Sequence, residues 1–443
     1  MHDRNAKLPF LSVFLAVWLC YFCSLASLGL FGFQVNHERI WVAATYQAIF
    51  AALVAAPVVL LPSTIVRPPT VFSRRIALIV IGLSLSVLGI ASLYAGKLRT
   101  GIDYSAGVCV ARVQMTNLAQ GGHTASLFNM VGYLLGLSFF VSTAAAVTQS
   151  TTRKECWLTI SASVALLVLF SIVAASRTSI ALYISFLLAL AIVRFSMGSP
   201  IPKIRFLDVA FGLVLVGVCF GFILYVFNCR AEMTRVTTTA YMNDFAPYLG
   251  VQLSQPQASP PTGDIPLVGS TSTGETAPIA SVIARTIPLV GMTLLYFTHS
   301  AFTFSEVSHL PPEEARVLFV YPLDLLARTG LIHPPNGDWK FAGRSLSLPG
   351  ELFHDYRLAG LIVGSVLLGL MIWFGLRLVR AYPTNLAVIG SVGLLLTIAI
   401  LSPLHSAFDF LGFPFVCCSF FLVLMSEYGI RRLPRGSKAS VFE

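Results

Sequence analysis

Residues 157–194 read WLTISASVALLVLFSIVAASRTSIALYISFLLALAIVR, two apolar runs joined by a short turn that contains Arg177. Each run is close to the roughly 20 apolar residues that an α-helix needs to cross the hydrocarbon core of a bilayer. We therefore expect spans at 157–175 and 178–194, which form a tight helical hairpin. The composition agrees, because the 443 residues are 56% hydrophobic and 11% charged, against roughly 25% charged in soluble domains. Such a chain is an integral membrane protein, which excludes soluble Rossmann enzymes, nucleic-acid-binding modules and secreted disulfide scaffolds.

Further apolar runs of similar length predict an all-α polytopic membrane protein with about ten transmembrane helices. The first run lacks the small-residue cleavage site that closes a signal peptide, so we interpret it as a span. The other predicted spans are 8–30, 40–61, 76–96, 127–149, 207–229, 358–378, 385–402 and 410–428. They divide the chain into an N-terminal membrane region (1–229, seven spans), a long loop (230–357), and a C-terminal membrane region with a tail (358–443, three spans).

The distribution of Lys and Arg predicts the orientation of these spans. Basic residues are denser in the short connections that share a side with both termini, for example at Arg74, Arg75, Arg153 and Lys154. Because short cytoplasmic connections carry the excess of Lys and Arg, we expect both termini in the cytoplasm and the loop 230–357 outside. The net charge of +10 then suits anionic lipid or an anionic substrate.

The long loop is expected to contain three kinds of segment. The apolar stretches 286–297 and 315–327 are expected to be interfacial or re-entrant, since one extra crossing would move the C-terminal arginines to the outer side. Residues 254–278, rich in Gly, Pro, Ser and Thr and without an aromatic residue, are expected to be mobile. The end of the loop, from Lys340 to Arg357, concentrates ionisable side chains.

Most of the eight cysteines fall in apolar runs, where we expect free thiols that pack as small hydrophobic side chains. This interpretation includes the pair at Cys20 and Cys23, which has metal-like spacing but no second pair nearby. Cys109 and Cys229 both fall on the expected outer side, where a disulfide is allowed, although the sequence does not favour that pairing.

Arg177 is the most unusual charged residue near the predicted spans. An arginine between two apolar runs is costly to place in a membrane unless it has a function or reaches the interface. It is either an anion clamp at the tip of the hairpin, which we favour, or a turn residue that extends to the headgroup region.

A second candidate site closes the long loop. If the chain becomes helical near residue 351, Glu351, His354 and Asp355 share one face, because positions three and four apart are neighbours. The alternative is an ordinary solvated helix start, with Asp355 favoured by the helix dipole. The outer loop also carries more arginine than lysine, which suits bidentate phosphate binding. No P-loop, HExxH, DxD or Ser-His-Asp signature is present, so no divalent metal is predicted.

Two short elements resemble the Wzy-type O-antigen or exopolysaccharide repeat-unit polymerases of bacterial inner membranes. One is Ser176-Arg177-Thr178 in the hairpin, and the other is the loop exit SLPGELFHDYRLAG at 347–360. The exit resembles the family pattern T-x-L-G-x-x-Y-x-D-F-G-x-x-G, with Asp355-Tyr356 on the D-F pair and Gly360 on the last Gly. Arg357 departs from this pattern, which usually has Gly at that position. The larger side chain puts the family's local helix packing in doubt, and its guanidinium is a further candidate phosphate ligand.

The resemblance implies a metal-independent, GT-C-like glycosyltransferase that needs no cofactor and works at the periplasmic face. Its substrate would be an undecaprenyl-pyrophosphate-linked oligosaccharide in membrane lipid, and a polysaccharide chain-length regulator is a further candidate partner. Acid-base chemistry would fall to Asp355, His354 or Glu351, with His405 in reserve. The residues expected to hold the pyrophosphate are Arg177, Arg235, Arg316, Arg344 and Arg357.

Three alternatives remain open at this point. An O-antigen ligase would use the same chemistry with a lipid A core acceptor, and His354 alone does not separate the two. A flippase or transporter fits the number of spans, but no internal repeat is visible. A purely structural membrane protein is the third alternative.

Overall fold

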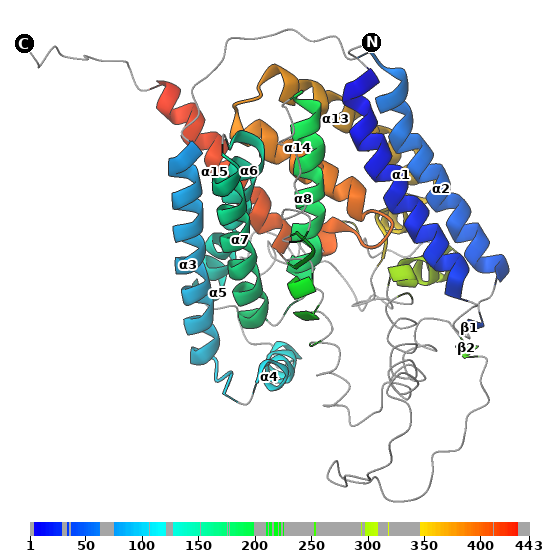
Figure 1. Ribbon diagram of the computed structural model, residues 1–443. Coiled ribbons are helices and arrows are strands. Elements are labelled where there is room, and N and C mark those ends of the chain that lie inside the picture. Colours follow the sequence, from blue (N-terminus) through cyan, green and yellow to red (C-terminus); the bar gives the residue numbers. More distant parts are fainter. Residues whose placement is uncertain are drawn as a thin grey trace, which may run out of the picture.

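The computed structural model describes a bundle of long helices (Figure 1). The described residues are 4–28, 33–34, 37–62, 75–105, 107–120, 127–150, 152–174, 176, 178–198, 297–308, 346–410 and 412–432, with isolated residues at 210–225, 252–253, 294 and 318. The predicted span 207–229 and most of the long loop therefore lie outside the described residues.

Helices are present in the described residues at the positions of nine of the ten predicted spans. They are α1 (Arg4–Ser27), α2 (His37–Leu60), α3 (Arg75–Arg99), α4 (Val108–Gln120), α5 (Leu127–Gly136), α6 (Phe139–Gln149), α7 (Arg153–Val173), α8 (Thr178–Ser196), α13 (Leu348–Ala381), α14 (Leu386–Leu401) and α15 (Gly412–Arg432). Residues 297–308 are also helical, and the short elements are η2 (Ala407–Asp409) and the antiparallel pair of β1 (Phe33–Gln34) and β2 (Gln252–Leu253).

Length and composition make the chain a polytopic membrane protein. Within the described ranges, seven helical segments are long and apolar enough to cross a membrane, and two shorter apolar helices lie at Leu386–Leu401 and Gly412–Met425. Large apolar side chains also cover the outside of the bundle, such as Leu60 (77% exposed) and Ile76 (65% exposed). An exterior with this many exposed large apolar side chains is stable in lipid and not in water. The total of ten spans remains a prediction.

Side-chain caps explain where several helices begin. The Thr152 hydroxyl accepts a hydrogen bond from the Glu155 amide (3.3 Å) ahead of α7, and the Asn385 side chain accepts one from the Val388 amide (3.0 Å) ahead of α14. Each cap satisfies an amide that has no partner within its helix. These helices therefore start at residues that the local sequence specifies.

The predicted span 127–149 is divided into α5 and α6 at Leu137–Ser138. The Ser138 amide bonds to Leu135 (3.0 Å) and the Phe140 amide to Leu137 (3.1 Å), the tighter three-residue pattern that interrupts an α-helix. Close packing accompanies the break, because a Cβ on Gly89 of α3 would lie 2.1 Å from the Gly136 amide nitrogen. The apolar pattern of this segment contains no signal for such a break.

The bundle has two chemically different ends. At the one we call the basic end, Lys7 donates to the carbonyl of Leu61 (2.6 Å), and Arg380 donates to that of Ser196 (3.1 Å). These cations bind carbonyls that the last turns of other helices leave unpaired. The start of α1 and the end of α15 lie at this same end, and α4 lies at the opposite one (Figure 1).

The cysteines follow the expectation with one correction. The described free thiols are Cys20, Cys23, Cys156, Cys219, Cys417 and Cys418. Cys109, at the start of α4, is disulfide-bonded, although the sequence did not favour a disulfide there. Cys229, the candidate partner that the sequence did not favour, lies outside the described residues. The disulfide belongs to the end of the bundle opposite the basic end.

Candidate active site

Helix α13 is two helices joined at Arg357. A continuous helix of its 34 residues would measure roughly 50 Å, well beyond the roughly 30 Å of hydrocarbon in a bilayer. The backbone of Arg357 has φ 56° and ψ −151°, and it is the one residue other than glycine with positive φ in the described part of the chain. The kink separates residues 348–356 from a segment that begins at Leu358, the predicted start of the span.

This backbone conformation is one that glycine adopts far more readily than arginine. The region at positive φ with ψ near ±150° is almost restricted to glycine, and a side chain there costs about 1–3 kcal/mol. The arginine at this position is therefore accommodated in a strained kink of α13. The guanidinium of Arg357 lies 5.8 Å from the centre of the Phe353 ring, one turn back along α13.

His354 and Asp355 form a buried pair just before this kink. Nδ1 of His354 lies 2.8 Å from Oδ1 of Asp355, and their side chains are 5% and 1% exposed. The other oxygen, Oδ2, accepts a hydrogen bond from the Leu318 amide (2.9 Å). An imidazole whose Nδ1 donates to a carboxylate presents Nε2 as a proton acceptor. Because both side chains are buried, the alternative interpretation of this segment as a solvated helix start is wrong.

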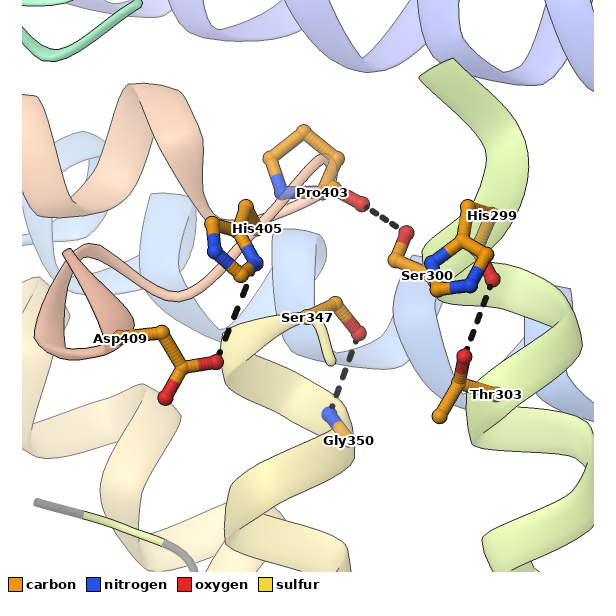
Figure 2. Close-up of polar contacts among 8 residues, drawn as sticks. All are labelled: His299, Ser300, Thr303, Ser347, Gly350, Pro403, His405 and Asp409. Atoms are coloured by element: carbon orange, nitrogen blue, oxygen red, sulfur yellow. Dashed lines mark hydrogen bonds and ion pairs between the residues drawn. The ribbon is translucent and has the colours of Figure 1, made fainter. Parts of the chain in front are cut away.

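The connection between α14 and α15, residues 402–411, folds back onto the start of α13. The Leu348 amide donates to the carbonyl of Ser402 (3.3 Å), and the Ser406 amide donates to that of Leu346 (2.9 Å). These bonds bring His405 and Asp409 beside the first turn of α13, as Figure 2 shows. Nδ1 of His405 lies 3.8 Å from Oδ2 of Asp409.

Glu351 joins this second group from the first turn of α13. Its side chain is fully buried, and neither carboxyl oxygen has a hydrogen-bond partner of good geometry among the described residues. The carboxyl of Asp409 and the hydroxyl of Ser406 are nevertheless close enough to interact with it electrostatically. Glu351, His405 and Asp409 are named here the carboxyl–imidazole group.

Burial shifts the pKa of both titratable groups of the connection toward the uncharged form. It raises the pKa of Asp409 from 3.8 to about 7, and the nearby carboxyl of Glu351 opposes that rise only in part. Burial also lowers the pKa of His405 from 6.5 to about 3, assisted by the nearby charge of His299. Near neutral pH, His405 is therefore neutral and Asp409 is close to its midpoint.

A chain of buried hydrogen bonds holds the site against the N-terminal helices. Gln47 of α2 donates to the hydroxyl oxygens of Ser347 (3.3 Å) and Tyr21 (3.1 Å). The hydroxyl of Ser300 lies 3.1 Å from that of Tyr21 and donates to the carbonyl of Pro403 (2.6 Å; Figure 2). Ser347 also caps α13 by accepting from the Gly350 amide (3.3 Å). The network fixes the first turn of α13 in a buried environment, where each hydrogen bond is electrostatically stronger than in water.

The structure brings together the predicted residues that it describes. Glu351, His354, Asp355 and Arg357 all lie within the first turns of α13. Arg177, Arg235, Arg316 and Arg344 lie outside the described residues, so their binding of pyrophosphate remains a prediction. The flanking hydroxyls of Ser176 and Thr178 are 2.8 Å apart.

Asp409 is the site residue that the sequence reasoning missed. The sequence predicts His405 only as a reserve candidate. The signal that could have identified Asp409 is its spacing of four residues from His405, within a polar stretch between two apolar runs. Within the described part of the chain, no group of three or more His, Cys, Asp or Glu side chains is arranged to hold a metal ion.

Comparison with protein-family models, with curated proteins and with solved structures gives no match to this chain.

Proposed function

We propose that this chain is a metal-independent glycosyltransferase that polymerises undecaprenyl-pyrophosphate-linked oligosaccharide repeat units. The observation that carries the proposal is the buried His354–Asp355 pair, held at the kink of a polytopic membrane bundle beside Arg357. The motif resemblance of residues 176–178 and 347–360 supports the same conclusion. A GT-C-like architecture with ten spans is part of this proposal.

The proposed reaction needs one proton acceptor and one anion-binding group. The oxygen of an acceptor hydroxyl forms a bond to the anomeric carbon of the growing glycan, and its proton passes to the His354–Asp355 pair. The bond from the anomeric carbon to the phosphate oxygen breaks, and its electron pair leaves on undecaprenyl pyrophosphate. Arginines stabilise that charge, as electrostatic groups do at developing anions. Arg357 is a described candidate, and Arg177, Arg235, Arg316 and Arg344 are the others.

We place the site at the periplasmic face of a bacterial inner membrane, with both termini in the cytoplasm. The basic end of the bundle suits the cytoplasmic side, because short cytoplasmic connections are rich in Lys and Arg. The disulfide at Cys109 suits the opposite, oxidising side. The partners in this proposal are membrane lipid, the lipid-linked oligosaccharide and a polysaccharide chain-length regulator.

The test is polymerisation by the purified protein in liposomes that contain lipid-linked repeat units. We expect a ladder of longer glycans and release of undecaprenyl pyrophosphate, both unaffected by a metal chelator. His354→Ala and Asp355→Asn should lower kcat by about 10²–10⁴-fold, the usual contribution of general acid-base catalysis. Asp103→Asn is the matched control, because Asp103 is an exposed carboxylate bonded to the Ser105 amide (2.8 Å).

Three outcomes would contradict the proposal or the role of its acid-base pair. Transfer of glycan only when a lipid A core acceptor is added would identify a ligase. Movement of the lipid-linked unit across the bilayer without elongation would identify a flippase. Equal activity of Asp355→Asn and Asp103→Asn would remove the His354–Asp355 pair from the chemistry.

A further inference from the structure

Two carboxyl groups from different parts of the chain are buried together beside the proposed acid-base pair. Glu351 is on α13, one turn before Asp355, and Asp409 is in η2 on the connection between α14 and α15. Both carboxyl oxygens of Glu351, the hydroxyl of Ser406 and Nδ1 of His405 are buried without a hydrogen-bond partner among the described residues. Unsatisfied polar atoms gathered at one place need a proton or a ligand to be stable.

Among the described residues, no cation acts on the two carboxyls. The groups that act on Glu351 electrostatically are Asp409, Ser406 and Asp355. His405 lies 3.8 Å from Asp409, and His299 acts on His405. Helix α14 and residues 412–425 of α15 contain no charged residue. His405 stays neutral because it is buried, and His354 is engaged by Asp355. Two adjacent buried carboxyls that no cation of the described residues neutralises do not both ionise near neutral pH.

We propose that Glu351 and Asp409 share a single proton and so limit the negative charge beside His354 and Asp355, which lets an anionic lipid pyrophosphate bind there. The inference rests on the proposed function for the identity of the anion. When pH rises, the pair releases its proton to water and gains one negative charge. That charge repels the pyrophosphate without changing the groups that perform the transfer. Glu351 and Asp409 are thus electrostatic positioning residues.

Binding of undecaprenyl pyrophosphate to the protein in nanodiscs tests the electrostatic part. For the wild type, we expect the Kd to rise roughly tenfold more between pH 7 and pH 9 than it does for Glu351→Gln, the effect of one charge about 12 Å away at an effective dielectric constant of about 20. Glu351→Gln keeps the shape of the side chain and cannot ionise, so the variant never carries the second charge. Asp409→Asn should behave in the same way, and Asp103→Asn should follow the wild type. Any titration of undecaprenyl pyrophosphate itself affects the Kd of the wild type and of all three variants equally, so it cancels in the comparison.

Infrared spectroscopy tests the shared proton without any substrate. The wild type should lose a protonated carboxyl signal between pH 6 and pH 9, and Glu351→Gln/Asp409→Asn should lack that change. If the wild type lacks the signal, the inference is overturned whatever the enzyme does. If the wild type polymerises glycan while its Kd has the same pH dependence as that of Glu351→Gln, the electrostatic role is overturned and the proposed function stands. If the signal is present but neither polymer nor pyrophosphate binding is found, the proposed function and the electrostatic role both fail.

Discussion

Arg357 combines two properties that substitutions can separate, a backbone conformation typical of glycine and a guanidinium near the proposed leaving group. Arg357→Gly should remove strain of about 1–3 kcal/mol, offset by about 0.4–1 kcal/mol from the greater freedom of glycine in the unfolded chain. We therefore expect the thermal midpoint in detergent to rise by a few degrees while affinity for undecaprenyl pyrophosphate falls. Arg357→Ala should lose the same affinity without the gain in stability.

Arg377 provides the control for this comparison. It lies in the regular part of α13, with its guanidinium 4.9 Å from the Trp373 ring centre, so Arg377→Gly should destabilise by about 1 kcal/mol. A loss of stability in Arg357→Gly as large as that in Arg377→Gly would show that the kink stores no strain. Full pyrophosphate affinity in Arg357→Gly would remove the guanidinium from the binding site.

At the scale of elements, the connection between α14 and α15 carries two titratable groups whose effects on stability have opposite signs. The folded pKa of Asp409 is raised to about 7, so its contribution is present below the unfolded value of 3.8 and is lost as pH rises to 7. The folded pKa of His405 is lowered to about 3, so its contribution is present above 6.5 and is lost as pH falls to 3. Between pH 4 and 6.5 the two contributions oppose each other.

Variants of this connection should therefore change the pH dependence of stability in opposite directions. Asp409→Asn should make the thermal midpoint rise with pH between 4.5 and 6.5, relative to the wild type, because the contribution of Asp409, which falls with pH, is removed. His405→Gln should make it fall with pH over the same range. The measurement is thermal denaturation in detergent, with Asp103→Asn as the reference. Slopes that change in the same direction in both variants would indicate general damage to the connection instead of these two titrations.

The helices and their connections differ in how well the sequence predicts them. Apolar runs predicted α7, α8 and α14 closely, because the length of a span and its caps are local properties. The break at Ser138 and the kink at Arg357 depend on neighbouring helices and on backbone strain, which leave no periodic signal. Glu351, His354 and Asp355 are close in sequence and were predicted as a group. Asp409 was not, because the fold-back of residues 402–411 onto Leu346 and Leu348 is a long-range contact.

At the scale of the whole molecule, the two ends of the bundle make the orientation testable. Tyr382 is exposed between α13 and α14 at the basic end, whereas Glu351 and Asp355 lie at the far end of the same kinked helix. One crossing by residues 358–381 therefore places the site on the opposite side of the membrane from Tyr382. In the proposed orientation, the excess of Lys and Arg puts the side of Tyr382 in the cytoplasm. The predicted loop 230–357, including Ser272, would then be periplasmic.

Labelling of single introduced cysteines decides this orientation. The six described free cysteines are replaced, while Cys109 and Cys229 are kept so that the disulfide can form. In cells with a permeabilised outer membrane, an impermeant maleimide should label Ser272→Cys at once. It should label Tyr382→Cys only after the inner membrane is also opened, because short basic connections are retained in the cytoplasm. The opposite pattern would place the His354–Asp355 pair on the cytoplasmic side, where lipid-linked repeat units are not polymerised in the proposed reaction. Labelling of both positions in intact inner membranes would show that the kinked helix does not cross the bilayer.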